Sequence, residues 1–243
     1  MSTAAYNLDT EQIPQPATIK RPSILWEASA MFQPLRLLAS YPKLRKAPKG
    51  NGERIILFPG WLSHDTVMYP IKKYLQQLGY APEYWGLGIN KGQVEIDRNR
   101  MIAKLEKEDS DEKVILMGWS LGGLIAREVA REMPDKIEKV ITYGTPVVGG
   151  PKYTIGEKVY SKELVEEIHA TIQEFDATNP IQVPIRAIFT KNDSIVNWSA
   201  CIDRTSKDVQ HFEVDSTHFS LGVDPKVWEI IANILAGPTI KFQ

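Results

Sequence analysis

A serine between glycines is the clearest chemical signal in this sequence. The run Gly118-Trp119-Ser120-Leu121-Gly122 has the pattern G-x-S-x-G, and it joins the apolar stretch 113–118 to the amphipathic stretch 121–133. A serine at such a strand-to-helix turn exposes its hydroxyl, and the glycines leave room for the neighbouring backbone. The pattern by itself is weak evidence, and its position between a predicted strand and a predicted helix strengthens it. We predict that Ser120 is a nucleophile, with a tight turn that has no chemistry as the alternative.

A nucleophilic serine needs a base, and the base needs a carboxylate to orient it. His218 lies in the loop 215–220, after the last apolar run, and Asp193 lies in the loop 191–196, after the run before it. The order Ser, Asp, His and the positions after strands favour these two residues. The alternatives are a solvated loop histidine and an Asx turn or helix cap. Other acids and histidines are less well placed: His64, His169, His211, Asp176, Asp203 and Asp215.

Acyl transfer also needs hydrogen-bond donors for the oxyanion. The Leu121 amide lies at the start of the helix that follows Ser120, and the loop 58–62 offers the Trp61 amide, with the Leu62 amide as a fallback. An ordinary turn is the alternative for this loop. Several apolar residues flank the predicted site and could bind substrate, although core packing is an equal expectation for each of them. They are Leu62, Trp119, Val147, Val148, Ile195 and Phe219.

Six short apolar runs alternate with amphipathic stretches, which predicts a mostly parallel sheet covered by helices on both faces. The runs are 55–58, 81–87, 113–118, 137–143, 184–190 and 209–214. The amphipathic stretches are 67–78, 94–105, 121–133 and a last one that begins at Asp224-Pro225. Because parallel strands end at one edge of the sheet, this order places Ser120, Asp193 and His218 together.

Two segments lie outside this alternation. Residues 1–52 form an N-terminal part with an arm over 1–22, a helix over 23–40 that Ser23 caps and that Pro34 kinks or restarts, and a link over 41–52. The remaining residues, 53–243, form the main domain. Within it, the stretch 147–182 is longer than a plain crossover needs and includes a helix over 162–175. The apolar stripe of that helix is narrow, so we expect a small fixed cap rather than a mobile lid.

Several motifs in order resemble those of the α/β-hydrolase superfamily, in particular its bacterial serine esterases and lipase-like members. They are Pro59-Gly60-Trp61, the turn at Ser120, Tyr143-Gly144-Thr145-Pro146, and the loops of Asp193 and His218, and they cover about 53–236. The chain departs from the pattern in having Pro59 where many relatives have histidine. It also lacks the two antiparallel strands that often precede the first parallel strand.

The resemblance implies an α/β-hydrolase fold with about six strands and hydrolysis of a carboxylic ester through an acyl-enzyme, with no cofactor and no metal. The substrate would be a small-molecule or lipid ester. An acyltransferase with the same three residues is the nearest alternative, and a catalytically silent binding domain is another. The sequence does not indicate the acyl chain, the alcohol or the oligomeric state.

Composition and charge narrow the possible binding partners and the cellular location. The 243 residues have a net charge of −1, which gives no electrostatic support for nucleic-acid binding. One cysteine, no signal-like start and no apolar run of spanning length favour a cytoplasmic protein. Residues 20–54 are basic, with eight Lys/Arg against two Glu. We interpret the basic stretch 43–49 as a solvated linker, with peripheral contact to anionic lipid through it and the N-terminal helix as the alternative.

Overall fold

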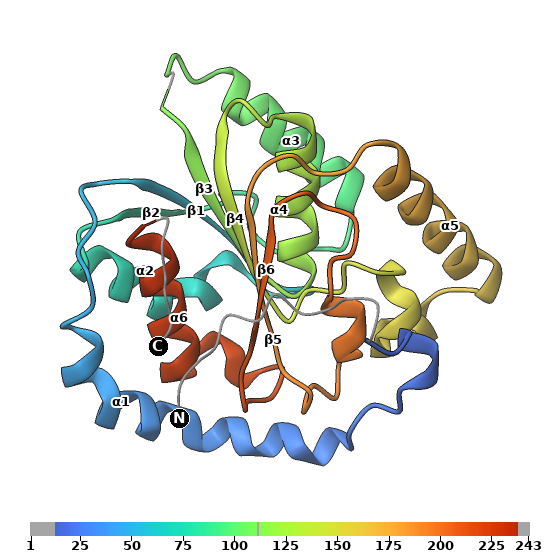
Figure 1. Ribbon diagram of the computed structural model, residues 1–243, viewed down its shortest axis with the longest axis horizontal. Helices are drawn as coiled ribbons and strands as arrows, with labels where there is room; N and C mark the ends of the chain where they lie inside the picture. The colour runs from blue at the N-terminus through green and yellow to red at the C-terminus, as the bar shows by residue number, and fades with distance from the viewer. Residues whose placement is uncertain (1–12, 111, 238–243) are drawn as a thin grey trace.

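The fold is built on a parallel sheet, as the alternating pattern predicts (Figure 1). The computed structural model describes residues 13–110 and 112–237. Its strands are β1 (Arg54–Phe58), β2 (Ala81–Tyr84), β3 (Val114–Trp119), β4 (Ile137–Tyr143), β5 (Ile185–Phe189) and β6 (Val209–Glu213). They follow the order β2-β1-β3-β4-β5-β6, and every neighbouring pair is parallel. The prediction of an α/β-hydrolase sheet of about six strands is confirmed.

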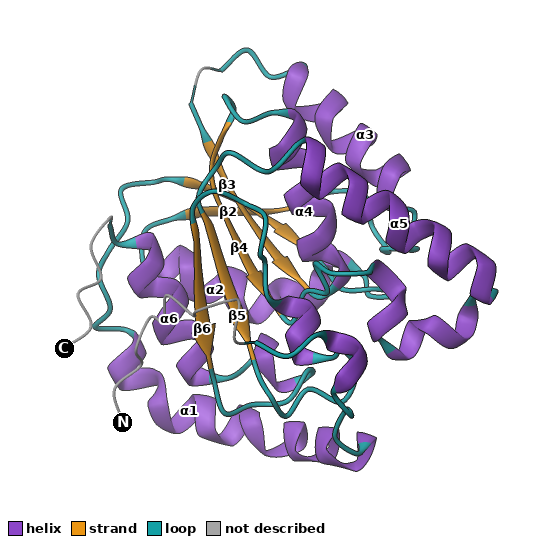
Figure 2. Cartoon of the chain, turned by 45° about the vertical axis from the view of Figure 1, so that its right-hand side comes forward, coloured by secondary structure: helices purple, strands orange, loops and turns teal. Residues whose placement is uncertain are grey.

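Helices cover both faces of this sheet (Figure 2). Alternate side chains of β1 point to opposite faces, so Ile55 and Leu57 enter one apolar core and Ile56 and Phe58 enter the other. The first core is closed by α1 (Gln33–Leu44), α2 (Tyr69–Gln77) and α6 (Pro225–Leu235). The second is closed by α3 (Val94–Glu106) and α4 (Leu121–Glu132). Strands buried on both faces explain why their sequences are continuously apolar.

The N-terminal part packs along one edge of the molecule. A 3-10 helix, η3 (Ile24–Phe32), starts where Ser23 Oγ accepts a hydrogen bond from the Leu25 amide, and α1 continues from it. The helix restarts near Pro34, as predicted, but it runs on to Leu44, so the first residues of the expected link are helical. Residues 1–12 of the predicted arm, and Pro238 after the last helix, lie outside the described residues.

The described part of the arm docks on the main domain. The Asn197 side-chain amide donates to the carbonyl oxygens of Pro16 (2.8 Å) and Ile19 (3.0 Å). Arg21 donates to the carbonyl oxygen of Ile195 (3.3 Å). These bonds hold the arm against the segment that follows β5, close to the loop that contains Asp193.

A small cap separates β4 from β5. It consists of η5 (Gly150–Tyr153), η6 (Ile155–Val159) and α5 (Lys162–Thr178), which begins where Ser161 Oγ accepts from the Leu164 amide. Lys152 pairs with Glu166 at 2.6 Å, and Arg131 of α4 pairs with Asp176 at 2.6 Å. The first of these ion pairs joins α5 to η5 within the cap, and the second joins α5 to α4 of the main domain.

A buried histidine makes the stability of the fold depend on pH. His211 of β6 accepts a hydrogen bond at Nε2 from the Asp203 amide, 3.0 Å away, next to the buried ion pair of Asp203 with Arg127. Burial, together with Arg127 and Arg204, lowers the pKa of His211 to about 4, although Asp203 opposes this shift. The folded protein therefore keeps His211 neutral at a pH where an unfolded chain would protonate it.

We expect the stabilisation from neutral His211 to be complete above about pH 6.5, the ordinary imidazole pKa, and to fall as the pH drops toward 4. Between pH 7.5 and 5 this group should remove about 2 kcal/mol from the free energy of unfolding, at about 1.4 kcal/mol per pH unit. Urea unfolding of the wild type and of His211→Gln at both pH values measures this loss in the free energy of unfolding. The variant keeps a hydrogen-bond acceptor without titrating, so an equal loss in both proteins would contradict the assignment.

Candidate active site

Ser120 occupies a strained turn between β3 and α4. Its backbone has φ +53° and ψ −126°, a conformation that non-glycine residues rarely adopt. Two of the flanking glycines are required because the backbone of a neighbouring segment lies too close to leave room for a Cβ atom. A Cβ on Gly118 would lie 2.4 Å from the backbone of Gly123, and one on Gly122 would lie 2.4 Å from the carbonyl oxygen of Pro59. The sequence pattern is thus a steric requirement of the turn that presents the Ser120 hydroxyl.

The structure brings Ser120, His218 and Asp193 into one hydrogen-bonded series. His218 Nε2 lies 3.0 Å from Ser120 Oγ, and His218 Nδ1 lies 2.7 Å from Asp193 Oδ2. The other carboxylate oxygen of Asp193 accepts from the amides of Ile195 (2.9 Å) and Val196 (2.7 Å). Because a carboxylate only accepts, it places the imidazole proton on Nδ1 and leaves Nε2 free to accept from the serine hydroxyl. His218 and Asp193 are almost fully buried.

Each member of this series comes from the carboxyl end of a different strand, namely β3, β5 and β6. The other acids considered in the sequence have different partners. Asp203 is paired with Arg127, Asp176 with Arg131, and Asp215 accepts from the side chain of Asn192. His64 accepts instead from the amide of Thr66, at the start of a 3-10 helix.

The loop after β1 lines the same cavity as Ser120. Trp61 and Leu121 both line the cavity at this point. The fallback donor is already engaged, since the Leu62 amide donates to the carbonyl oxygen of Asn90 at 2.8 Å. Asn90 is fully buried, and its side-chain amide donates to the carbonyl oxygen of Pro59 at 2.8 Å. Sequence reasoning missed this residue, which holds the loop from the neighbouring segment 87–92.

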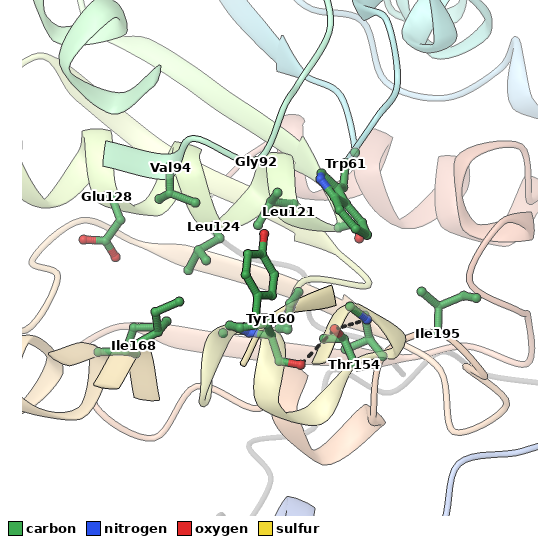
Figure 3. A pocket seen from close by; sticks show the side chains of 18 of the residues that line it. Trp61, Gly92, Val94, Leu121, Leu124, Glu128, Thr154, Tyr160, Ile168 and Ile195 are labelled. Carbon is green, nitrogen blue, oxygen red and sulfur yellow. Dashed lines mark hydrogen bonds between the residues drawn. The ribbon is translucent and has the colours of Figure 1, made fainter. Parts of the chain in front are cut away.

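Ser120 and His218 line a cavity of about 690 Å³. Figure 3 shows this cavity from close by. In Figure 3, Trp61, Leu121 and Leu124 lie along one wall, and Thr154 and Ile168 of the cap lie opposite. The apolar stripe of α5 contributes Leu164, Ile168, Ile172 and Phe175 to the lining. The cap helix therefore presents its apolar face to the cavity, and only Val165 of that helix is buried.

Three of the six predicted substrate-binding residues line this cavity: Trp119, Ile195 and Phe219. The structure places the other three elsewhere. The side chain of Leu62 is 66% exposed and lies outside the lining of the cavity, and its backbone adopts a positive φ of 57°. The amides of Val147 and Val148 both donate to the carbonyl oxygen of Ala200, and Val148 packs against a small core under the site. These two residues follow β4 but do not line the cavity.

Glu27 is a site residue that the sequence analysis did not identify. Its carboxylate reaches from η3 to both loops of the site, and it accepts from Ser194 Oγ (2.8 Å), from the His218 amide (3.2 Å) and from the Phe219 amide (3.0 Å). Burial raises the pKa of Glu27, but these hydrogen bonds outweigh it and hold the pKa below its ordinary value. One signal was available, since Glu27 is the only acidic residue between Lys20 and Lys49.

Comparisons with known proteins indicate the family of this chain. The model of the dienelactone hydrolase family matches residues 82–217. A pimeloyl-[acyl-carrier protein] methyl ester esterase from Vibrio parahaemolyticus is 25% identical over 156 residues, 56% of each chain. The corresponding esterase from Aliivibrio salmonicida is 29% identical over 135 residues, which are 52% of this chain and 51% of that protein. The chain thus spans about half the length of the curated relatives it matches.

The fold is also found among solved structures. Mouse alpha/beta hydrolase domain-containing protein 10 superposes with a TM-score of 0.56 at 20% identity, covering 78% of this chain and 92% of that one. At this identity the likeness concerns the fold, which is that of the α/β-hydrolases.

Proposed function

This chain belongs to the dienelactone hydrolase family, and from that premise we propose that it hydrolyses carboxylic esters through Ser120, His218 and Asp193. The observation that carries the proposal is the series of hydrogen bonds from Ser120 Oγ through His218 to Asp193, at the floor of a largely apolar cavity. The matched relatives named as esterases support the reaction class. The proposal assigns a role to each of these side chains and to two backbone amides.

In the first half of the reaction, Ser120 Oγ attacks the ester carbonyl carbon while His218 Nε2 removes the hydroxyl proton. Asp193 stabilises the imidazolium that forms. The carbonyl oxygen becomes an oxyanion and accepts hydrogen bonds from the amides of Trp61 and Leu121, the latter at the positive end of α4. When the tetrahedral intermediate collapses, the bond to the alkoxy oxygen breaks, and His218 donates its proton to the leaving alcohol.

In the second half, a water molecule attacks the acyl-enzyme and His218 accepts its proton. A second tetrahedral intermediate collapses, the acid leaves, and the proton returns to Ser120 Oγ. An alcohol or thiol in place of water would make the same residues an acyltransferase. The volume and the apolar lining of the cavity suit a small-molecule ester or the ester-bearing end of a lipid.

Labelling with a fluorophosphonate probe and a panel of p-nitrophenyl esters, from acetate to palmitate, tests this proposal. We expect the probe to modify Ser120 alone, as mapped by mass spectrometry, and at least one ester to be hydrolysed with saturation. Product analysis with added alcohols separates hydrolysis from acyl transfer. A correctly folded protein that neither reacts with the probe nor cleaves any ester would contradict the proposal.

A further inference from the structure

The segment formed by η3 and α1 exposes an unusual amount of apolar surface. Its inner face packs on the domain through Glu27, Gln33, Leu37 and Leu44. The other side carries seven large apolar side chains, each at least 59% exposed, and we call them the outer face. They are Ile24, Leu25, Trp26, Met31, Phe32, Leu35 and Leu38. Apolar side chains gathered at this density on a surface indicate a contact with a partner or a membrane.

The charges around the outer face indicate which partner it fits. Between Lys20 and Lys49 there are seven Lys/Arg and one acidic residue, Glu27, which is buried and hydrogen-bonded on the inner face. Arg36, Lys46 and Lys49 are exposed. Positive charge is therefore concentrated on one segment of a chain whose net charge is −1. A second copy of this basic segment would be repelled, whereas an anionic surface would be attracted.

An apolar face with an exposed tryptophan and flanking cations is typical of helices that lie in the plane of a membrane interface. Among the described residues, no helix is long and apolar enough to cross a bilayer. The segment runs along an outer edge of the molecule, where a flat surface can reach it (Figure 1). We propose that the outer face and the basic residues beside it dock this protein on an anionic lipid bilayer.

Co-sedimentation with vesicles tests this docking. The full chain is incubated with vesicles of phosphatidylcholine alone or of phosphatidylcholine with 30% phosphatidylglycerol (about one anionic lipid in three, enough to set a negative surface potential). We expect binding to the anionic vesicles, weakened by salt, and little binding to the neutral ones. Leu25→Ser/Met31→Ser removes the two most exposed side chains of the outer face and should lower the partition coefficient about tenfold or more.

Ile96→Ser/Val159→Ser is the matched control, because it removes two exposed apolar side chains from α3 and the cap. It should bind as the wild type does, and thermal melts should show that both double variants fold. Equal binding to neutral and anionic vesicles, or equal loss in both double variants, would overturn the proposal. So would a concentration-dependent dimer that Leu25→Ser/Met31→Ser abolishes, since the outer face would then be an interface between copies.

A separate observation concerns the inner face. Glu27 Oε1 accepts from Ser194 and from the His218 amide, while Oε2 accepts from the Phe219 amide. Ser194 follows Asp193 directly, so one carboxylate joins the loop of the acid to the loop of the base. We infer, on the basis of the proposed function, that Glu27 is a positioning residue that holds His218 in line with Ser120 and Asp193.

Glu27→Gln tests this role, because it retains the shape of the side chain but replaces one accepting oxygen by an NH₂ group. We expect kcat to fall about tenfold or more, with KM changed by less than about threefold, because a small displacement of His218 lengthens its bonds. The downfield NMR resonance of the Nδ1 proton between His218 and Asp193 should broaden or disappear. Glu163→Gln is the control, because Glu163 is an exposed residue of α5. It should alter neither kcat nor the Nδ1 proton resonance.

A lower melting temperature with unchanged kcat and an unchanged resonance would show that Glu27 is only structural and would overturn the inference. If the wild type hydrolyses no ester, the proposed function fails, but the resonance still decides whether Glu27 holds His218 against Asp193.

Discussion

Replacing Ser120 with alanine is expected to lower kcat by about 10⁴-fold or more while the protein remains folded. The variant lacks the oxygen that forms the acyl-enzyme, so only the oxyanion donors and the binding of substrate would still accelerate the reaction. The change also removes little packing, since Ser120 lies at the floor of a cavity. Initial rates on the best p-nitrophenyl ester, with circular dichroism to check folding, measure the effect.

Ser63→Ala is the matched control for this experiment. It removes a second hydroxyl from the lining of the same cavity, where Ser63 Oγ donates only a long bond of 3.5 Å to the carbonyl oxygen of Trp61. Its kcat should stay within about threefold of the wild-type value, the range usual for a residue outside the reacting group. A Ser120→Ala protein that keeps its wild-type rate would exclude the serine mechanism.

Replacing Asp193 with asparagine should lower kcat by a similar factor, about 10⁴-fold. Asp193 Oδ1 accepts from the amides of Ile195 and Val196, so an asparagine would keep its carbonyl oxygen there and direct its NH₂ group at His218. Two donors would then meet unless His218 moved its proton from Nδ1 to Nε2. In that tautomer Nε2 donates and cannot remove the proton of Ser120, although the local structure is preserved.

Asp215→Asn provides the comparison for this variant. Asp215 lies in the same loop as His218, but it is exposed and bonds to the side chain of Asn192. Its replacement should leave kcat nearly unchanged. The reverse result, with Asp215→Asn inactive and Asp193→Asn active, would show that the acid has been assigned to the wrong loop. Steady-state kinetics of both variants on one ester decide whether Asp193 or Asp215 is the acid.

Much of the fold follows from local patterns in the sequence. Strands buried on both faces are continuously apolar, and the amphipathic stretches between them form the helices, so the order of elements and the parallel sheet are predictable. The turn at Ser120 is predictable for a related reason, because Gly118 and Gly122 mark positions where a Cβ would meet backbone. Parallel strands then place the loops of Asp193 and His218 beside that turn.

Contacts between segments far apart in the chain were decided by the tertiary structure alone. Glu27 meets the amides of His218 and Phe219 across more than 190 positions, and Asn90 holds the loop of Trp61 from the segment that follows β2. Likewise, Leu62 and Phe219 are both apolar loop residues, yet only Phe219 faces the cavity. Periodicity reports how a side chain is oriented within its own helix or strand. It carries no information on which distant group satisfies a buried carboxylate, or on whether an apolar helix face meets protein or remains exposed, because these depend on packing in three dimensions.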